Sequence, residues 1–302
     1  MRVAITGASG LIGSAPSPML RESGADVVHL VRRSPTADHE RRWDPDSQRV
    51  DVETLADCDG LVSLHGAGIG DRRWNASYKQ ELVTSRTHGT TALGYALRTL
   101  AEHGHVVRWI SGSAVGFYGD RGEEPLTEAS TPGSGFLSEL TRAWEGATLP
   151  AAQAGVPVAF ARTGIVLSPE GGALVPLLRM IRLGAGGPFG RGRAWWPWIT
   201  LDDHVRALVF LLHHPEITGP VNLASPGEAR QGEVVSAIAR ALRRPSVLPV
   251  PPPALRVVVG EFAGDILASQ RMRPEVLLDA GFSFRHADLA TMARWVATPR
   301  RD

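Results

Sequence analysis

Three glycines near the amino terminus have the spacing of a phosphate-binding loop. Gly7, Gly10 and Gly13 lie between the apolar residues 3–5 and a second apolar stretch. Gly7 would let the chain turn tightly off a strand, Gly10 would let the backbone approach a pyrophosphate, and Gly13 would let a helix pack closely on the strand. The anion would bind free amides at the start of that helix. An ordinary tight turn is the alternative, but the position between strand and helix favours a dinucleotide site.

Two arginines end the second buried strand, which we predict over residues 26–33. Folds that select NAD usually place an acidic side chain here to bind the ribose hydroxyls. Arg32 and Arg33 stand there instead. A guanidinium can bind a 2′-phosphate through paired, charge-assisted hydrogen bonds, whereas a carboxylate would repel it. The sequence therefore predicts NADP, and the alternative is a solvated strand end.

The elements that position these residues alternate along the first half of the chain. The expected elements are strands over residues 106–111 and 156–162, a strand that opens into a small-residue loop over residues 60–68, and a helix over residues 79–101. Their alternation predicts an α/β fold, a doubly wound parallel sheet with helices on both faces. Pro16 and Pro18 fall in the helix that follows the glycines, so that helix either begins late or is distorted at its start.

Composition changes in the second half of the chain. Residues 184–198 are rich in glycine, arginine and tryptophan, and residues 245–253 are dense in proline. Neither stretch fits an alternating sheet. We expect an NADP-binding domain over residues 1–165, its sheet completed by parts of 199–225, and a smaller C-terminal substrate lobe over residues 166–302. Ligands bind at the carboxyl ends of parallel strands, where that lobe would complete the pocket.

The overall composition is that of an ordinary globular protein. The 302 residues include 32 basic and 31 acidic side chains, a formal charge of +1, which favours neither nucleic acid nor an anionic membrane as a partner. No apolar run approaches the roughly 20 residues that span a bilayer, and we expect no secretory signal, because the first strand occupies the amino terminus. A single cysteine, Cys58, can form neither an internal disulfide nor a cysteine cluster for a metal. We expect a cytoplasmic monomer or homodimer that acts on a small molecule.

Several motifs together resemble the extended short-chain dehydrogenase/reductases. They are the glycine loop and the segments 64–67, 88–90 and 111–119. The match sharpens to one atypical branch, the NAD(P)-dependent epimerase-like proteins once labelled cell-division-inhibitor homologues, on the segments 72–74, 116–122, 162–167 and 195–199. Residues 249–286 resemble the small C-terminal domain of that branch. The resemblance covers essentially the whole chain and implies a Rossmann fold that binds NADP.

The resemblance also implies which residues bind the cofactor. The loop that lines the diphosphate would comprise Gly7, Ser9, Gly10, Leu11, Ile12 and Gly13. Arg32, with Arg33 beside it, would bind the adenosine phosphate. The wall near the cofactor's ribose would comprise His65, Gly66 and Ala67, and Ser111 would also bind the cofactor. Glu81 and Arg86 match positions that this branch is thought to use for the nucleotide, and the alternative for this pair is a surface ion pair on a helix.

The usual proton-transfer residues of the superfamily are missing from the expected helix. Working members use a serine or threonine together with a tyrosine and a lysine that lie four residues apart. Leu137 and Thr141 stand at the tyrosine and lysine positions, and neither side chain can transfer that proton at neutral pH. Ser113 matches the serine and could polarise a carbonyl. Tyr118 is the nearest phenol for the acid role, and its alternative is a core aromatic with a satisfied hydroxyl.

Two functions remain open on these residues. The first is an NADP-dependent oxidoreductase or epimerase-like enzyme with an unknown carbonyl or hydroxyl substrate. The second is a regulatory or scaffold protein that senses NADPH without turnover, because the tyrosine and lysine are missing.

Two further segments could have either a functional or a structural role. Residues 190–198 could be a mobile lid that holds substrate on its aromatic rings, or a packed seam between lobes. Asp202, Asp203 and His204 could suggest a metal, but we expect no metal site and instead a helix start with an aspartate cap.

Overall fold

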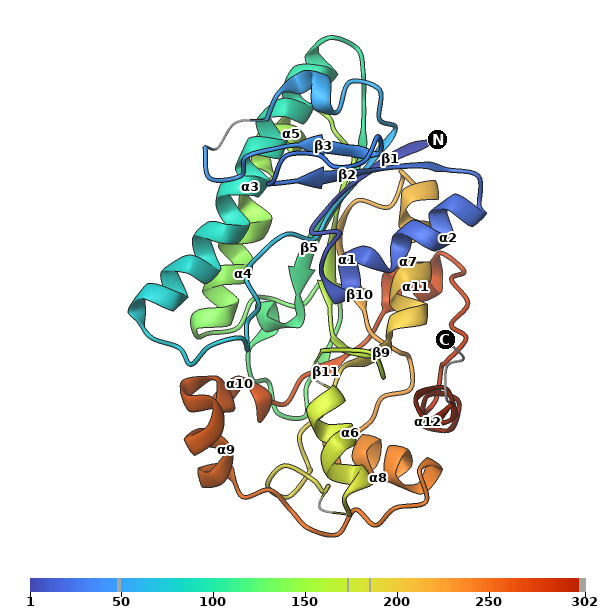
Figure 1. Ribbon diagram of the computed structural model, residues 1–302. Coiled ribbons are helices and arrows are strands. Elements are labelled where there is room, and N and C mark those ends of the chain that lie inside the picture. Colours follow the sequence, from blue (N-terminus) through green and yellow to red (C-terminus); the bar gives the residue numbers. More distant parts are fainter. Residues whose placement is uncertain (48–49, 173, 185, 299–302) are drawn as a thin grey trace.

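A parallel sheet of seven strands forms the centre of the computed structural model, which describes residues 1–47, 50–172, 174–184 and 186–298 (Figure 1). Across the sheet the strands are β10 (Gly219–Leu223), β7 (Val158–Thr163), β5 (Arg108–Ala114), β4 (Gly60–Ser63), β1 (Arg2–Thr6), β2 (Asp26–Val31) and β3 (Glu40–Arg42). Every neighbouring pair is parallel. The strand order reverses between β1 and β4, which confirms the expected doubly wound α/β fold.

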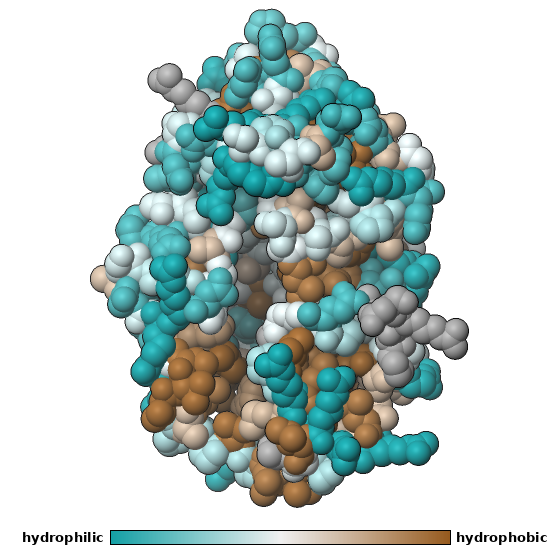
Figure 2. Space-filling model, in the orientation of Figure 1, coloured by the Kyte–Doolittle hydropathy of each residue, from teal (hydrophilic) through white to brown (hydrophobic). Residues whose placement is uncertain are grey.

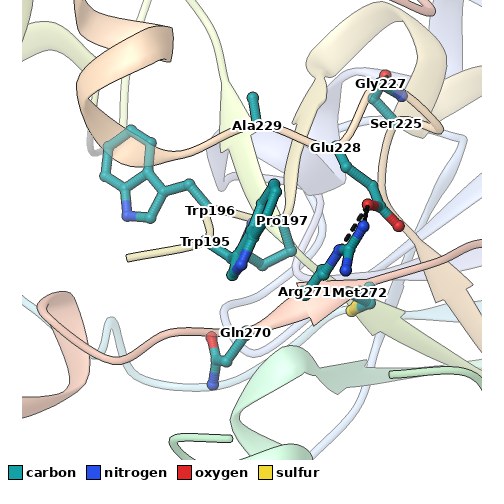
Figure 3. Close-up of a pocket in the computed structure, with 10 residues that line it drawn as sticks. All are labelled: Trp195, Trp196, Pro197, Ser225, Gly227, Glu228, Ala229, Gln270, Arg271 and Met272. Carbon is teal, nitrogen blue, oxygen red and sulfur yellow. Dashed lines mark hydrogen bonds and ion pairs between the residues drawn. The ribbon is translucent and has the colours of Figure 1, made fainter. Parts of the chain in front are cut away.

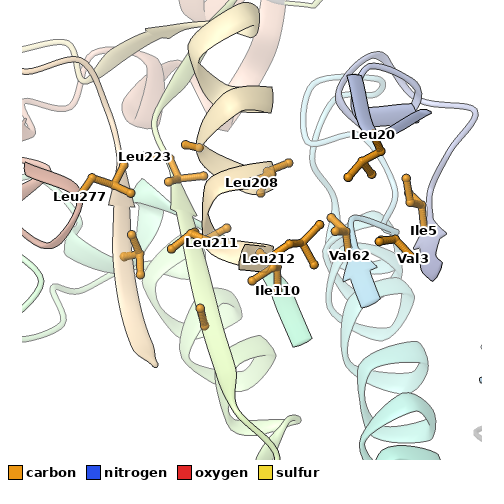
Figure 4. Packing of buried hydrophobic residues seen from close by; sticks show 14 of the residues in the cluster. Val3, Ile5, Leu20, Val62, Ile110, Leu208, Leu211, Leu212, Leu223 and Leu277 are labelled. Atoms are coloured by element: carbon orange, nitrogen blue, oxygen red, sulfur yellow. The ribbon is translucent and has the colours of Figure 1, made fainter. Parts of the chain in front are cut away.

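Helices cover both faces of the sheet (Figure 1). One face carries α3 (Ala76–Glu102), α4 (Phe136–Gly146) and α5 (Leu149–Gln153), and the other carries α1 (Leu11–Ser14), α2 (Pro16–Glu22), α7 (Leu201–His213) and α11 (Glu275–Asp279). Successive strand residues point to opposite faces. Val3 and Ile5 therefore pack with Leu208 of α7 (Figure 4), while Ala4 packs with Leu93 of α3. Both faces of the sheet are buried under helices, as is usual for a parallel sheet.

The elements begin and end close to the predicted residues. β2 ends at Val31, so the two arginines lie just beyond it. α3 begins earlier than expected because the Asn75 side chain accepts a hydrogen bond from the Tyr78 amide at 2.8 Å and caps the helix. The helix after the glycines is divided into α1 and α2, and Pro16 stands in the first turn of α2, where its missing amide costs little.

The second half of the chain builds a smaller lobe below the carboxyl edge of the sheet (Figure 1). Its core lies between α6 (Leu174–Arg182), α8 (Gln231–Ala241) and α12 (Leu289–Ala297). Two short parallel pairs join the parts, β8 (Ile165–Leu167) with β9 (Trp198–Thr200) and β6 (Pro125–Leu126) with β11 (Arg271–Met272). The remaining elements are α9 (Pro252–Val259), α10 (Ala263–Ile266) and the 3-10 turns η1 (Val52–Thr54), η2 (Val115–Tyr118) and η3 (Gly260–Phe262).

The C-terminal region also contacts the sheet domain on the side of α3. The Phe262 ring lies 5.2 Å from the Trp74 ring, which is 5.1 Å from Phe136 at the start of α4. Lys79 Nζ pairs with Glu261 at 2.5 Å across the same contact. These contacts hold the α9–α10 hairpin beside α3 and α4. Among the described residues, no helix is long and apolar enough to cross a membrane.

Candidate functional site

The loops after β1 and β4 meet where the strand order reverses, which is where open α/β sheets bind their ligands. Gly7 has φ +71°, and a Cβ on it would lie 2.6 Å from the Leu64 carbonyl oxygen. A Cβ on Gly13 would lie 2.1 Å from the Gly7 carbonyl oxygen. These two glycines are therefore required by the fold of the loop itself. Gly10 is different, because its Cβ would have its nearest neighbour, Gly7 O, at 3.4 Å.

The glycine loop presents an open, uncapped helix start. Gly10 is the N-cap of α1 and no side chain caps the helix, so its first amides lack intrahelical partners. Ser9 and Gly10 are exposed, while Leu11 and Ile12 are half-buried. A Cβ on Gly171 would lie 3.0 Å from Leu11, so the small lobe reaches this loop.

The two arginines after β2 have different surroundings. Arg33 forms an ion pair with Glu40 and donates further hydrogen bonds to Ser34 O and Thr36 Oγ1, both at 3.0 Å. The Arg33 guanidinium lowers the pKa of the Glu40 carboxyl to about 2. Arg32 is exposed and forms no ion pair or side-chain hydrogen bond within the part of the chain that the structure describes. Arg32 is thus the guanidinium available to a phosphate.

His65 lies in the loop after β4, beside the end of β1, as a neutral imidazole. Its Nδ1 is 2.9 Å from Thr6 Oγ1, its ring is 4.9 Å from Trp43, and burial lowers its pKa to about 4. Its Nε2 is buried and has no hydrogen-bond partner within the described residues. This atom points toward Gly89, where an added Cβ would lie only 2.5 Å from it. His65 therefore shapes the wall by packing. Ser111 is fully buried in the middle of β5, next to Ser63 at the end of β4.

Glu81 and Arg86 do not pair with each other. Glu81 is exposed and forms an ion pair with Arg72 at 3.4 Å. Arg86 is buried, donates to Ala67 O at 2.9 Å and Leu82 O at 3.0 Å, and lies over the Trp144 ring. The surface ion pair between Glu81 and Arg86 considered from the sequence is thus wrong. Through its hydrogen bond to Ala67 O, Arg86 supports the loop that contains Gly66. Burial lowers the pKa of Arg86 to about 10.

A buried charge pair holds Ser113, a pair that the sequence reasoning missed. Ser113 Oγ donates to Glu145 Oε1 at 2.6 Å. Arg162 of β7 grips both oxygens of the Glu145 carboxylate, with Nε at 2.8 Å and an Nη at 3.0 Å, and stacks at 3.4 Å on the Phe117 ring. Burial lowers the pKa of Arg162, but its bonds to Glu145 and Tyr118 outweigh burial and the net shift is upward. A charged residue within an otherwise apolar strand was the one signal that could have revealed this pair.

Tyr118 is fully buried and its hydroxyl is satisfied on three sides. The hydroxyl oxygen accepts from Arg162 at 3.0 Å, and the hydroxyl lies 2.6 Å from Asn222 Oδ1 and 3.1 Å from Thr127 O. Burial raises the pKa of Tyr118. The arrangement favours the core-aromatic alternative over an acid that reaches substrate.

The helix that should carry the tyrosine and lysine is packed against η2. Thr141 is buried, and its hydroxyl donates to Leu137 O at 2.6 Å. A Cβ on Gly116 would lie 2.9 Å from the Leu137 Cβ, so the two backbones are close. Neither side chain offers an ionisable group, whereas Glu145, four residues beyond Thr141 and so on the same side of α4, does.

The segment 190–198 is mostly packed. Trp196 and Trp198 are buried in the core of the small lobe, and Trp195 Nε1 donates to Glu123 at 2.7 Å while Arg271 lies over its ring. The cavity beside these residues (Figure 3) is about 10 Å³, room for at most one water. This geometry favours the seam between lobes over the lid.

The acidic start of α7 has a structural role. Thr200, not an aspartate, is the cap, since its hydroxyl accepts from the Asp203 amide at 3.2 Å; the expectation of an aspartate cap is wrong. Asp203 is buried and accepts from the amides of Arg285 and His286. Among the residues described, no group of three or more His, Cys, Asp or Glu side chains could hold a metal ion.

Comparisons with known proteins agree with this architecture. Residues 3–244 match the model of the NAD dependent epimerase/dehydratase family, and residues 250–296 match a domain of unknown function, DUF1731. An epimerase family protein of Mycobacterium leprae is 41% identical over 297 residues, 98% of this chain and 95% of that protein.

Two solved structures extend the comparison. The human epimerase family protein SDR39U1, solved with NADPH, is 28% identical with a TM-score of 0.88, over 98% of this chain and 99% of that one. A nucleoside-diphosphate sugar epimerase of Corynebacterium glutamicum is 37% identical with a TM-score of 0.80, over 98% of this chain and 58% of that one. The chain therefore belongs to the NAD dependent epimerase/dehydratase family, in the extended short-chain dehydrogenase/reductase branch that carries a DUF1731 domain at its C-terminus.

Proposed function

We propose that this protein is an NADP-dependent, epimerase-like oxidoreductase. The observation that carries the proposal is the meeting of the β1 and β4 loops where the strand order reverses, with an uncapped glycine loop there and, just beyond β2, an Arg32 that is unpaired within the described residues. The human relative of the same fold was solved with NADPH. The diphosphate would lie along Gly7–Gly13, the 2′-phosphate on Arg32, and the ribose beside the loop that His65 and Arg86 support.

Ser113 is the residue best placed to contact a substrate oxygen. Its only hydrogen is donated to Glu145, so its free lone pairs can accept a hydrogen bond from a substrate hydroxyl. In an oxidation, the hydroxyl proton would pass to Ser113 Oγ while the serine proton passes to Glu145, and the hydride would leave to the nicotinamide that the cofactor supplies. Glu145 is then a positioning residue that would receive the serine proton, and Arg162 holds its carboxylate in place through two hydrogen bonds. This geometry favours a hydroxyl substrate over a carbonyl.

Nucleotide binding is the first test. Purified protein should enhance NADPH fluorescence and melt at a higher temperature with NADPH, and Gly10→Asp should abolish both effects because a carboxylate would stand in the diphosphate path. Gly264→Asp is the matched control, since Gly264 also has open space around it and lies far along the chain in α10. No response of the unaltered chain to NADPH would end the proposal.

The second candidate function is a protein that senses NADPH without turnover. The absence of any ionisable group at Leu137 and Thr141 favours it. A panel of alcohols and carbonyl compounds separates the two candidates: turnover that falls at least about a hundredfold in Ser113→Ala, with NADPH affinity retained, supports the enzyme. Tight NADPH binding with no turnover across the panel supports the sensor.

The proposal extends to organisation. We place the NADP-binding domain at residues 1–165 together with the strand and helix of 199–225, and the substrate lobe in the remainder of 166–302. We also propose a cytoplasmic monomer or homodimer, which light scattering and fractionation of cells would test.

A further inference from the structure

Two segments of the small lobe contain no acidic residue. Residues 171–201 and 234–260 hold eight arginines and neither aspartate nor glutamate. These are Arg179, Arg182, Arg191, Arg193, Arg240, Arg243, Arg244 and Arg256. The formal charge of +1 for the whole chain therefore conceals a local separation of charge.

The eight arginines are available to a partner. All eight are exposed, and within the described residues none forms an ion pair with a carboxylate. Arginines elsewhere commonly do, as Arg33, Arg162 and Arg273 show. Unpaired guanidinium groups on one part of a surface produce a positive potential that attracts anions.

The two segments lie side by side in the fold. The Val250 amide donates to Pro188 O at 2.8 Å, and the Gly190 amide donates to Val250 O at 2.9 Å. A Cβ on Gly184 would lie 3.8 Å from Pro245. The two segments therefore adjoin at Pro188, Gly190 and Val250, and α9 is part of the second of them. One exposed acidic residue outside the segments, Glu233, lies near Arg191, Arg193 and Arg240.

Large apolar side chains are exposed on the same surface. Leu183, Val247, Val257 and Val258 are 83%, 76%, 74% and 71% exposed, and Leu248 is also exposed. Figure 2 shows brown side chains at the lower edge and lower left of the molecule, where Figure 1 places α9 and the segment before it, with long teal side chains beside them. Exposed apolar side chains gathered in this way mark an interaction site. We call these five residues and the eight arginines the basic apolar face.

We propose that the basic apolar face binds the surface of a membrane that contains anionic lipids. The combination of charge and apolar side chains argues for this partner: guanidinium groups pair with lipid phosphates, while valine and leucine side chains enter the boundary between headgroups and acyl chains. Nucleic acid would use the arginines but not the exposed valines. The chain would lie on the membrane, because no described helix is able to cross it. This revises the expectation drawn from net charge alone.

Vesicle sedimentation with the full-length protein tests the proposal. Binding to vesicles of phosphatidylcholine and phosphatidylglycerol should exceed binding to phosphatidylcholine alone at least tenfold and should weaken as salt rises. Val257→Asp with Val258→Asp should reduce it at least tenfold, and so should Arg243→Glu with Arg244→Glu. The matched controls, Val106→Asp and Arg21→Glu, change exposed residues far from the face and should bind normally. Unchanged NADPH binding and melting temperature show that each variant is folded.

Several results would overturn the proposal. Equal binding of the unaltered protein to both kinds of vesicle would rule out an anionic membrane as the partner. So would vesicle binding that is as strong in the valine variants as in the unaltered protein. Duplex DNA that binds through the arginines regardless of the valine variants would assign the face to nucleic acid. A change from dimer to monomer in the valine variants, with no vesicle binding by the unaltered protein, would assign it to a second copy of this chain.

Discussion

At the scale of single residues, the site is divided between side chains that are open to ligands and side chains that hold the site together. Arg32 belongs to the first group, because it is exposed and unpaired within the described residues. Ser113 is buried, and it joins this group only through the lone pairs of its hydroxyl oxygen, which accepts no hydrogen bond within the described residues. Arg33, Arg86 and Tyr118 belong to the second, since their polar atoms are used within the protein. Neighbouring residues of one type can therefore have opposite roles, as the two arginines after β2 do.

Arg32→Ala should weaken NADPH binding while leaving NADH binding unchanged. One charge-assisted phosphate contact contributes about 1.5–3 kcal/mol, so NADPH affinity should fall roughly tenfold to a hundredfold. Fluorescence titration with both nucleotides measures the change in preference. Arg33→Ala is the comparison: it removes the bonds to Glu40 and should lower stability more than it alters the preference between nucleotides. An equal loss for NADH and NADPH in Arg32→Ala would contradict the role given to Arg32.

At the scale of elements, the local motifs were predictable and the long-range pairings were not. The strand, glycine loop and helix start of residues 2–14 were predicted because the residues that determine them are adjacent in sequence. The burial of Arg86 could not be predicted, since it depends on the loop containing Ala67 and on Trp144 of another helix. Glu145 and Arg162 pair across 17 residues, and nothing local indicates that an exposed-looking glutamate on α4 faces β7.

Gly10 and Gly13 of the loop give a prediction at this scale. Gly13→Ala should destabilise the protein by about 2 kcal/mol or more, because its Cβ would meet the Gly7 carbonyl oxygen at 2.1 Å and backbone must move. Gly10→Ala has its nearest contact at 3.4 Å and should fold nearly normally, yet lose NADPH affinity at least tenfold because the new methyl group stands where the diphosphate approaches. Chemical denaturation and nucleotide titration of both variants measure the two effects separately. Equal stability of the two variants would be inconsistent with the loop geometry.

At the scale of the whole molecule, buried polar groups as well as apolar packing hold the central sheet and its flanking helices together. His204 of α7 is fully buried and reaches Thr163 of β7 at 3.0 Å, while His65 lies between the first strand and α3. Burial lowers the pKa of each imidazole from 6.5 to about 4. Both histidines are thus neutral in the folded protein and must be protonated when it unfolds in mild acid.

The free energy of unfolding should therefore fall as the pH decreases from 6.5 to 4. The unfolded chain binds more protons in this range, and each histidine contributes a slope of about 1.4 kcal/mol per pH unit at most. Asp265 acts in the opposite direction, because burial raises its pKa to about 6 and its protonation stabilises the folded state below that pH. Denaturation curves at several pH values should show a steeper decline in Asp265→Asn than in the unaltered protein. An unchanged slope would show that Asp265 does not oppose the histidines.

The position of β10 has a consequence for how the chain is synthesised. β10 forms an edge of the sheet and pairs with β7, yet it comes from residues 219–223. On the ribosome, β7 emerges some 60 residues before its partner, at translation rates on the order of 5–20 residues per second. During those seconds the backbone amides and carbonyls of β7 form an open edge, which can pair with strands of other nascent chains. A chaperone that shields this edge until residue 223 has emerged would protect the protein during the most aggregation-prone stage of its synthesis.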